Sequence, residues 1–168
     1  MSARLLVCDA GPLIIQAKLG VLTRWISELK YNPVLLDVVV DEIKRGSFAY
    51  GEQQEIAQFL KQAKIVSFPE GKDTASGLSL QDQASLSYVE KMSPAILLAD
   101  DRLLRRAAKQ AAVPVIGFPG LMIQAVRKNL VTKEEALKLL DKAIELHDYR
   151  ISIALYQELR KQITACKT

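Results

Sequence analysis

The chain has 168 residues, of which 49% are apolar and 25% charged, and its net charge is +4. This length and composition are typical of a soluble globular domain that buries roughly 70% of its unfolded surface. No apolar run approaches the ~18 residues of a membrane span, and the first residues lack a signal-peptide pattern. We therefore expect a cytoplasmic protein without a membrane partner.

Strand-like and helix-like patterns alternate along the chain. Strands are predicted at residues 4–8, 34–36, 65–68, 95–99 and 113–116. Helices are predicted at 12–19, 22–29, 38–44, 52–63, 80–92, 102–112, 121–129, 132–146 and 152–163. A polar loop at 69–77 and a turn at 117–120 separate neighbouring elements. The alternation predicts an α/β fold in which helices cover both faces of a parallel sheet.

Several kinds of catalytic site are excluded by the scarcity of histidine and cysteine. The chain has one histidine and two cysteines, Cys8 and Cys166, whose spacing fits neither a zinc site nor a disulfide framework. His147 stands at the end of a predicted helix, where an imidazolium interacts well with the helix dipole, so we interpret it as structural. A histidine-pair ribonuclease and a Ser-His-Asp hydrolase are therefore excluded. Trp25 and Tyr31 are interpreted as packing residues.

Acidic residues stand where predicted strands end or predicted helices begin: Asp9, Glu42, Asp82, Asp100 and Asp101. Ligands of parallel sheets bind beyond the carboxyl ends of the strands, which favours convergence of Asp9 with the Asp100–Asp101 pair. Clustered carboxylates repel one another unless a divalent cation neutralises them. All-oxygen ligation suits Mg²⁺ or Mn²⁺, and these ions can activate water and stabilise charge on a phosphodiester.

Each acidic residue also has a structural interpretation. A half-buried carboxylate after an apolar strand is unfavourable unless it is paired or bound to metal, which favours function for Asp9. Glu42, taken alone, is better explained as a solvated helix residue. The helix dipole and the capping-box spacing after Ser79 suffice to explain Asp82. The pair at 100–101 is equally well a helix cap with a first-turn acid or a pair of metal ligands.

In combination, these segments resemble the PIN-domain nucleases. The matching segments are LLVCDAGPLI, VVVDEI, LSLQDQASL and LLADDRLLRRAA, followed by the turn VIGFPGLMIQA. The chain resembles most a prokaryotic VapC-like branch of this superfamily. The similarity covers about residues 4–130, with a weaker match in HDYRISIALYQELRKQI. It implies a three-layer α/β/α sandwich with a mainly parallel sheet of four or five strands. We expect one domain over 1–168, with a core at about 1–130 and C-terminal helices at 131–168.

The resemblance also implies an activity, that of an Mg²⁺- or Mn²⁺-dependent endoribonuclease. Its acidic site falls on Asp9, Glu42, Asp82 and Asp101, with Asp100 as an additional or alternative ligand. Expected metal ligands are thus Asp9, Asp82, Asp100 and Asp101. The implied substrate is RNA, and related toxins of VapBC-type pairs are commonly dimers that an antitoxin protein inhibits. A homodimer and an antitoxin are accordingly expected partners.

Two features leave alternatives open. Many PIN domains have Ser or Thr beside the first acid and two residues before the fourth, where this chain has Ala10-Gly11 and Ala99. These hydroxyls orient waters and carboxylates, so a catalytically weak PIN-like module that binds protein or nucleic acid is the alternative. A nuclease for DNA flaps or single strands is a third reading.

Basic residues follow the acidic pair. Arg102, Arg105 and Arg106 lie on the helix predicted at 102–112. They form either the solvated face of an amphipathic helix or contacts to the phosphates of a nucleic-acid strand.

Overall fold

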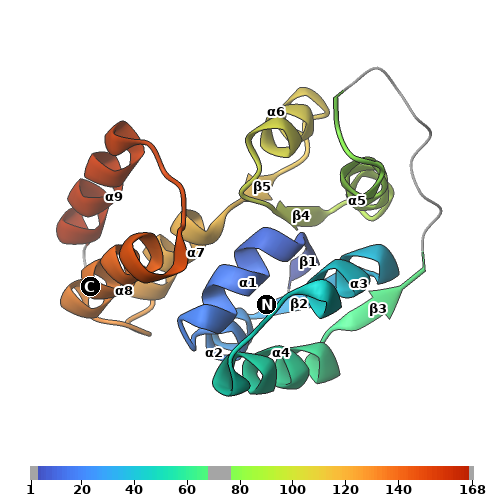
Figure 1. Cartoon of the computed structure of the whole chain (residues 1–168). Coiled ribbons are helices and arrows are strands. Elements are labelled where there is room, and N and C mark those ends of the chain that lie inside the picture. The colour runs from blue at the N-terminus through green and yellow to red at the C-terminus, as the bar shows by residue number, and fades with distance from the viewer. Residues whose placement is uncertain (1–3, 68–76, 167–168) are drawn as a thin grey trace.

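The computed structural model describes residues 4–67 and 77–166, and within them a five-stranded sheet forms the centre of the molecule (Figure 1). All four strand pairs are parallel, in the order β3-β2-β1-β4-β5. The strands are β1 (Arg4–Cys8), β2 (Tyr31–Leu36), β3 (Lys64–Val66), β4 (Ala95–Leu98) and β5 (Val115–Ile116). The α/β fold and the parallel sheet predicted from the sequence are confirmed.

The winding of the sheet reverses between β1 and β4. The chain first places β2 and then β3 to one side of β1, and later places β4 and β5 on its other side. Leu5 lies opposite Ala95 and Cys8 opposite Leu98, so β1 and β4 end at the same level. In open α/β sheets, ligands bind outside the strand ends at such a switch point. The residues that follow β1 and β4 are therefore the first place to look for a site.

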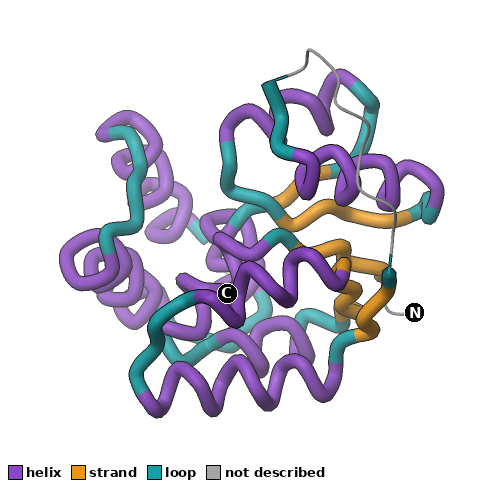
Figure 2. The backbone as a smooth tube through the Cα atoms, turned by 45° about the vertical axis from the view of Figure 1, so that its right-hand side comes forward, coloured by secondary structure: helices purple, strands orange, loops and turns teal. Residues whose placement is uncertain are grey.

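Helices cover the sheet on both faces. They are α1 (Ala10–Lys18), α2 (Leu22–Glu28), α3 (Asp37–Arg45), α4 (Tyr50–Gln62), α5 (Leu80–Lys91), α6 (Arg102–Gln110), α7 (Phe118–Arg127), α8 (Lys133–His147) and α9 (Ile153–Ala165). Figure 1 shows α5 and α6 on one side of the sheet and α1, α2 and α4 on the other. In Figures 1 and 2, α8 and α9 form a pair beside this sandwich, with α7 between the pair and the sheet.

The central strand β1 is apolar because it lies in the core of the molecule. Leu6, Val7 and Cys8 of β1 are fully buried, because β1 has a neighbouring strand on each side and helices on both faces. Trp25 is also fully buried, and its ring stacks on that of Phe118 with 6.2 Å between centroids. Its interpretation as a packing residue is confirmed.

Capping residues fix the beginnings of helices, as the sequence predicts. The Thr132 hydroxyl accepts a hydrogen bond from the Glu135 amide (3.1 Å), and the Glu135 carboxylate accepts one from the Thr132 amide (2.8 Å). This is the capping box expected at the start of α8. At α5, the Ser79 hydroxyl accepts from the amide of Asp82 (3.1 Å).

Some element boundaries differ from the sequence prediction. Helix α7 begins at Phe118 rather than at residue 121, because Pro119 fits the first helical turn, where no amide hydrogen is needed. Strand β2 begins at Tyr31 and includes Pro33, which lies opposite Leu6 of β1. Pro33 is outside the β2–β3 ladder, which pairs only Val34–Leu36 with β3. The predictions for residues 68–76 lie outside the described residues. None of the described helices has the length and apolarity that crossing a membrane requires.

Candidate active site

Asp9 and Asp100 leave the sheet as neighbours at the switch point. The amide of Asp9 donates to the carbonyl of Leu98 (2.9 Å), which extends the β1–β4 ladder to the residue after β1. The amide of Ala99 likewise donates to the carbonyl of Ile116 (2.9 Å), which holds the end of β4 against β5. The backbone thus fixes the start of both acidic side chains.

The pKa of Asp9 shows that other carboxylates lie nearby. It is raised from 3.8 to about 7, and burial of the side chain is the largest cause. The charge of Asp82 comes next, and the charges of Glu42 and Asp100 raise the pKa as well. A hydrogen bond from the backbone of Ala10 acts in the opposite direction. Asp9 therefore lies within electrostatic range of three of the other acidic residues predicted from the sequence.

Glu42 and Asp82 reach this place from different helices. Glu42 is an exposed residue of α3, one turn after Val38. Asp82 is half-buried in the first turn of α5, where Ser79 supplies the helix cap. Because Ser79 performs that task, the carboxylate of Asp82 is not needed for capping, and its charge acts on Asp9 instead.

Asp100 is held by three neighbours. Its Oδ1 accepts a hydrogen bond from the amide of Phe118 (2.9 Å), at the beginning of α7. The Tyr149 side chain and the positive charge of Arg105 also act to lower the pKa of Asp100. Burial is the largest effect and leaves the pKa of Asp100 raised. The other oxygen, Oδ2, is buried and has no partner at ordinary hydrogen-bond distance among the described residues.

Gly117 makes room for this arrangement. A Cβ atom at this position would overlap Oδ1 of Asp100 and would come within 2.9 Å of Nη1 of Arg105. The turn between β5 and α7 is therefore shaped to admit the carboxylate of Asp100. Gly117 was predicted only as part of a turn.

Asp101 has a different task from Asp100. Its Oδ1 accepts a hydrogen bond from the amide of Leu104 (2.8 Å), which makes it the N-cap of α6, and the residue is exposed. Asp101 is not among the residues that shift the pKa of Asp9. Of the adjacent pair, the structure turns Asp100 toward the other acids and Asp101 toward its own helix.

The donor set fits a hard divalent cation. Carboxylate oxygens suit Mg²⁺ or Mn²⁺, the buried Oδ2 of Asp100 lacks a partner, and a cation would relieve the repulsion that raises the pKa of Asp9. Across 4–67 and 77–166, no three Asp, Glu, His or Cys side chains lie close enough to hold one ion together. Mg²⁺ commonly keeps several waters and takes only one or two carboxylates. Asp9 and Asp100 would supply that number.

The three arginines of α6 are not equivalent. Arg102 and Arg106 are exposed, whereas Arg105 is half-buried and donates from Nη1 to the carbonyl of Ala99 (2.8 Å). Arg105 therefore supports the strand end beside Asp100. Arg102 and Arg106 remain available for contacts to a polyanion.

Tyr149 and Phe118 were not predicted as site residues. The amide of Phe118 binds Asp100, and backbone donors leave no signal in side-chain identity. Tyr149 lies 49 positions after Asp100 along the chain, although the segment HDYRIS around it was part of the weaker resemblance. Only the packing of the C-terminal helices brings it to the site.

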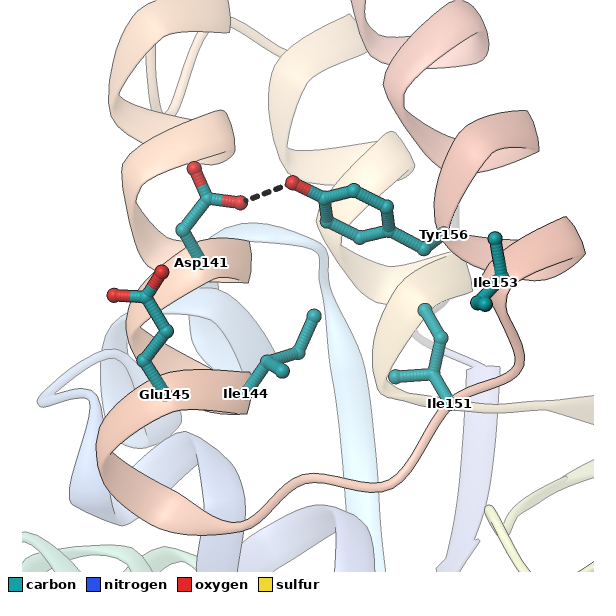
Figure 3. Close-up of a pocket in the computed structure, with 6 residues that line it drawn as sticks. All are labelled: Asp141, Ile144, Glu145, Ile151, Ile153 and Tyr156. Carbon is teal, nitrogen blue, oxygen red and sulfur yellow. Dashed lines mark hydrogen bonds between the residues drawn. The ribbon is translucent and has the colours of Figure 1, made fainter.

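A concave feature lies between α8 and α9 (Figure 3). This pocket has a volume of about 220 Å³ and is lined by Asp141, Ile144, Glu145, Ile151, Ile153 and Tyr156. The Tyr156 hydroxyl donates to Asp141 (2.7 Å) across its upper end in the view. None of the acids at the switch point lines it.

His147, at the end of α8, has a pKa lowered by burial and then by Lys18 and Lys142.

Comparisons with known proteins bear on the family and the fold. The model of the family described as PIN domain (DUF3368) matches residues 5–165. Among solved structures, the chain is similar to a PilT N-terminus domain protein, SSO1118, from Sulfolobus solfataricus P2, with a TM-score of 0.54 and 18% identity. That similarity covers 73% of this chain and 93% of the other, and it concerns the fold alone. No curated protein matches.

The family match extends over almost all of the described chain, including α8 and α9. The five-stranded parallel sheet with helices on both faces is in keeping with it. The chain belongs to the PIN-domain family, a family of the nuclease type.

Proposed function

We propose that this protein is a metal-dependent endoribonuclease, which hydrolyses phosphodiester bonds of RNA with Mg²⁺ or Mn²⁺. The observation that carries the proposal is the raised pKa of Asp9 amid Asp82, Glu42 and Asp100 at the switch point. A protein gains nothing in stability from gathering carboxylates that repel one another, so a bound cation is the simplest reason for the arrangement.

The cation would be held by Asp9 and Asp100, with Asp82 and Glu42 acting on it through their charge and through waters. When bound, it would supply activation of water and stabilisation of the charge that develops on the phosphodiester oxygens. Asp9 would be ionised in that state, since the cation counters the repulsion that otherwise raises its pKa. Asp100 would be kept in place by the amide of Phe118.

The remaining residues would bind the substrate. Arg102 and Arg106 are exposed on α6, the helix that Asp101 caps immediately after Asp100. They would hold phosphates beside the scissile bond and would contribute affinity without base specificity. The mechanism requires no histidine, which suits a chain whose single His147 lies at the end of α8.

The activity is tested with purified protein and end-labelled RNAs, single-stranded and structured, together with a single-stranded DNA of the same sequence. We expect cleavage of RNA with Mn²⁺ or Mg²⁺ and none with EDTA. Asp9→Asn and Glu42→Gln should reduce the rate about 100-fold or more, because they remove charge from the cation site. Asp41→Asn is the matched control, since Asp41 is the exposed neighbour of Glu42 on α3. Cleavage that persists in EDTA, or in Asp9→Asn, would refute the proposal. Preferential cleavage of DNA would show that the substrate is DNA rather than RNA.

A catalytically weak binding module is the second candidate. Two observations favour it: Ala10-Gly11 and Ala99 stand where hydroxyls are common in PIN domains, and no three described ligands share one position. Titration calorimetry with Mn²⁺ separates the candidates. Binding that Asp9→Asn and Asp100→Asn abolish supports the nuclease, and an absence of binding in the unaltered protein supports the module.

The proposal includes partners. We propose a homodimer and, as in toxin–antitoxin pairs, an inhibiting antitoxin protein. Light scattering across a concentration series tests the dimer, and a constant monomer mass would contradict it. Co-expression with the product of the neighbouring gene tests the antitoxin: a complex that no longer cleaves RNA is the expected result.

A further inference from the structure

Gly117 lies in the turn between β5 and α7, and its backbone conformation does not require a glycine (Figure 1). Its φ of −116° and ψ of 179° are extended angles that any amino acid adopts. Conformation favours glycine where φ is positive, as it is at Gly20 (φ 69°). The reason for a glycine at 117 therefore lies in the space around it.

This space is filled by polar groups at the end of β4. A Cβ atom at 117 would overlap Oδ1 of Asp100, and it would lie 2.9 Å from Nη1 of Arg105 and 3.2 Å from the carbonyl oxygen of Ala99. Separations under 3.0 Å are essentially never seen around real Cβ atoms, so a side chain at 117 would force some of these groups to move.

These groups are tied to one another by hydrogen bonds. Oδ1 of Asp100 accepts from the amide of Phe118 (2.9 Å), and the carbonyl of Ala99 accepts from Nη1 of Arg105 (2.8 Å). Phe118 is fully buried and stacks on the ring of Trp25, so its amide cannot follow a displaced carboxylate. A carboxylate that made room for a Cβ atom would leave this buried amide unpaired, which is unfavourable.

The two oxygens of Asp100 are thus in different situations. Oδ1 is engaged by the amide of Phe118, whereas Oδ2 is buried and has no partner at ordinary hydrogen-bond distance among the described residues. A buried polar atom without a partner is rare in native proteins and indicates a ligand that completes it. Oδ2 is therefore the oxygen that remains for a cation.

We propose that Gly117 is a positioning residue for Asp100. Because Gly117 has no side chain, Oδ1 can reach the amide of Phe118, and Oδ2 is left as the oxygen that a divalent cation binds. This inference rests on the proposed metal-dependent function. It gives a role in the acidic site to a residue that has no functional group of its own.

Gly117→Ala tests the proposal by adding a single Cβ atom. We expect the Mn²⁺ dissociation constant, measured by calorimetry, to rise about 10-fold, as is typical when a ligand loses the hydrogen bond that orients it. The kcat for RNA should fall by a similar factor with KM unchanged. The thermal midpoint in EDTA should fall by about 5 °C, because the added atom overpacks the turn.

Gly120→Ala is the matched control. It makes the same substitution in the first turn of α7, but its Cβ atom would come within 2.7 Å of Cγ1 of Ile116, an aliphatic side chain rather than a carboxylate. This variant should also lose thermal stability, yet it should bind Mn²⁺ as the unaltered protein does. An equal loss of Mn²⁺ affinity would mean that any overpacking of this turn weakens the site, and would overturn a specific role for Gly117.

A double-variant cycle in EDTA tests the contact without any metal. Asp100→Ala removes the carboxylate that a Cβ atom at 117 would overlap. The fall in thermal midpoint caused by Gly117→Ala should therefore be much smaller in the Asp100→Ala background, since residues in direct contact are not additive. An equal fall in both backgrounds would show that the added atom acts elsewhere, and the inference would be wrong.

The outcomes separate this inference from the proposed function. If Gly117→Ala binds Mn²⁺ normally while Asp100→Ala does not, the positioning role is wrong and the metal site stands. If the cycle shows the expected coupling but the unaltered protein does not bind Mn²⁺, the proposed function fails and the metal-related role of Gly117 fails with it.

Discussion

Asp9 occupies a position in which its own negative charge is unfavourable. The residue follows three fully buried residues of β1, and it faces the charges of Asp82, Glu42 and Asp100. Its neighbours therefore favour the protonated form in the folded, metal-free protein. Such a carboxyl group is a source of instability at neutral pH and an attractive ligand for a cation.

This has a measurable consequence for stability. The folded protein holds the Asp9 proton up to a pKa of about 7, whereas the unfolded chain releases it near 3.8. A raised carboxyl pKa means that folding is most favourable at low pH and weakens as pH rises from about 4 to 7. Asp9→Asn removes this dependence because its side chain stays neutral.

We therefore expect the free energy of unfolding of Asp9→Asn, relative to that of the unaltered protein, to increase from pH 5 to pH 8. The gain should be about 2–3 kcal/mol, which corresponds to the two pH units from 5 to 7 over which the folded protein keeps the proton. Urea unfolding in EDTA measures it at both pH values. A constant difference between the two proteins would show that Asp9 titrates normally.

At the scale of elements, the ends of β1 and β4 and the beginning of α7 determine the site. Two adjacent carboxylates follow β4, and the beginnings of two different helices separate their tasks: the amide of Phe118 in α7 binds Asp100, and the amide of Leu104 in α6 binds Asp101. The structure thus favours Asp100 over Asp101 as the ligand that completes the acidic set.

Substitution of Asp101 tests this division. Asp101→Ala should destabilise the protein by about 1 kcal/mol through loss of the α6 cap, while Asp101→Ser should keep most of the stability, since serine caps helices well. Asp101→Ser should also bind Mn²⁺ within about twofold of the unaltered protein, in contrast to Asp100→Asn. Loss of Mn²⁺ affinity in Asp101→Ser, measured by calorimetry, would instead make Asp101 a ligand.

Most elements could be predicted from the sequence because local signals specify them. The apolar run before Asp9 indicates a buried strand, and Ser79, Thr132 and Ser152 mark helix starts that the structure confirms by capping hydrogen bonds. The positions of acidic residues at the ends of strands could also be predicted from the sequence. The rule for parallel sheets favoured their convergence, but only the strand order, which places β4 beside β1, makes the two strand ends neighbours.

What the sequence left undecided was the orientation of side chains. Nothing local distinguishes Asp100 from Asp101, since the distinction comes from Phe118, 18 residues later. Arg105 likewise resembles its neighbours on α6, and only its hydrogen bond to the carbonyl of Ala99 separates it from the exposed Arg102 and Arg106. Contacts between distant segments decide these details.

At the scale of the whole molecule, the net charge of +4 is the sum of an acidic site and a more basic remainder. Acids are gathered at the switch point, while the chain as a whole carries 23 basic and 19 acidic residues. The exposed Arg102 and Arg106 lie on the helix that follows Asp100, and there they would attract a phosphate backbone toward a site that is itself negative.

Salt dependence of RNA binding tests this role. In the double variant Arg102→Ala/Arg106→Ala, the slope of log affinity against log salt should decrease in magnitude by about 1.4, since each phosphate contact to a single strand contributes about 0.7. Fluorescence anisotropy with a labelled RNA in EDTA measures it without cleavage. Lys138→Ala/Lys161→Ala, exposed positions on α8 and α9, is the control. An unchanged slope in the arginine variant would show that Arg102 and Arg106 make no phosphate contacts to RNA.

The central claim is that carboxylates distant in the sequence share one electrostatic site around Asp9. Carbon-13 NMR of the labelled aspartate carboxyl groups, titrated without metal, measures the pKa of Asp9 directly. We predict a value near 7 that falls in Asp82→Asn and falls again when Mg²⁺ is added to the unaltered protein. A value near 3.8 that responds to neither change would contradict the account.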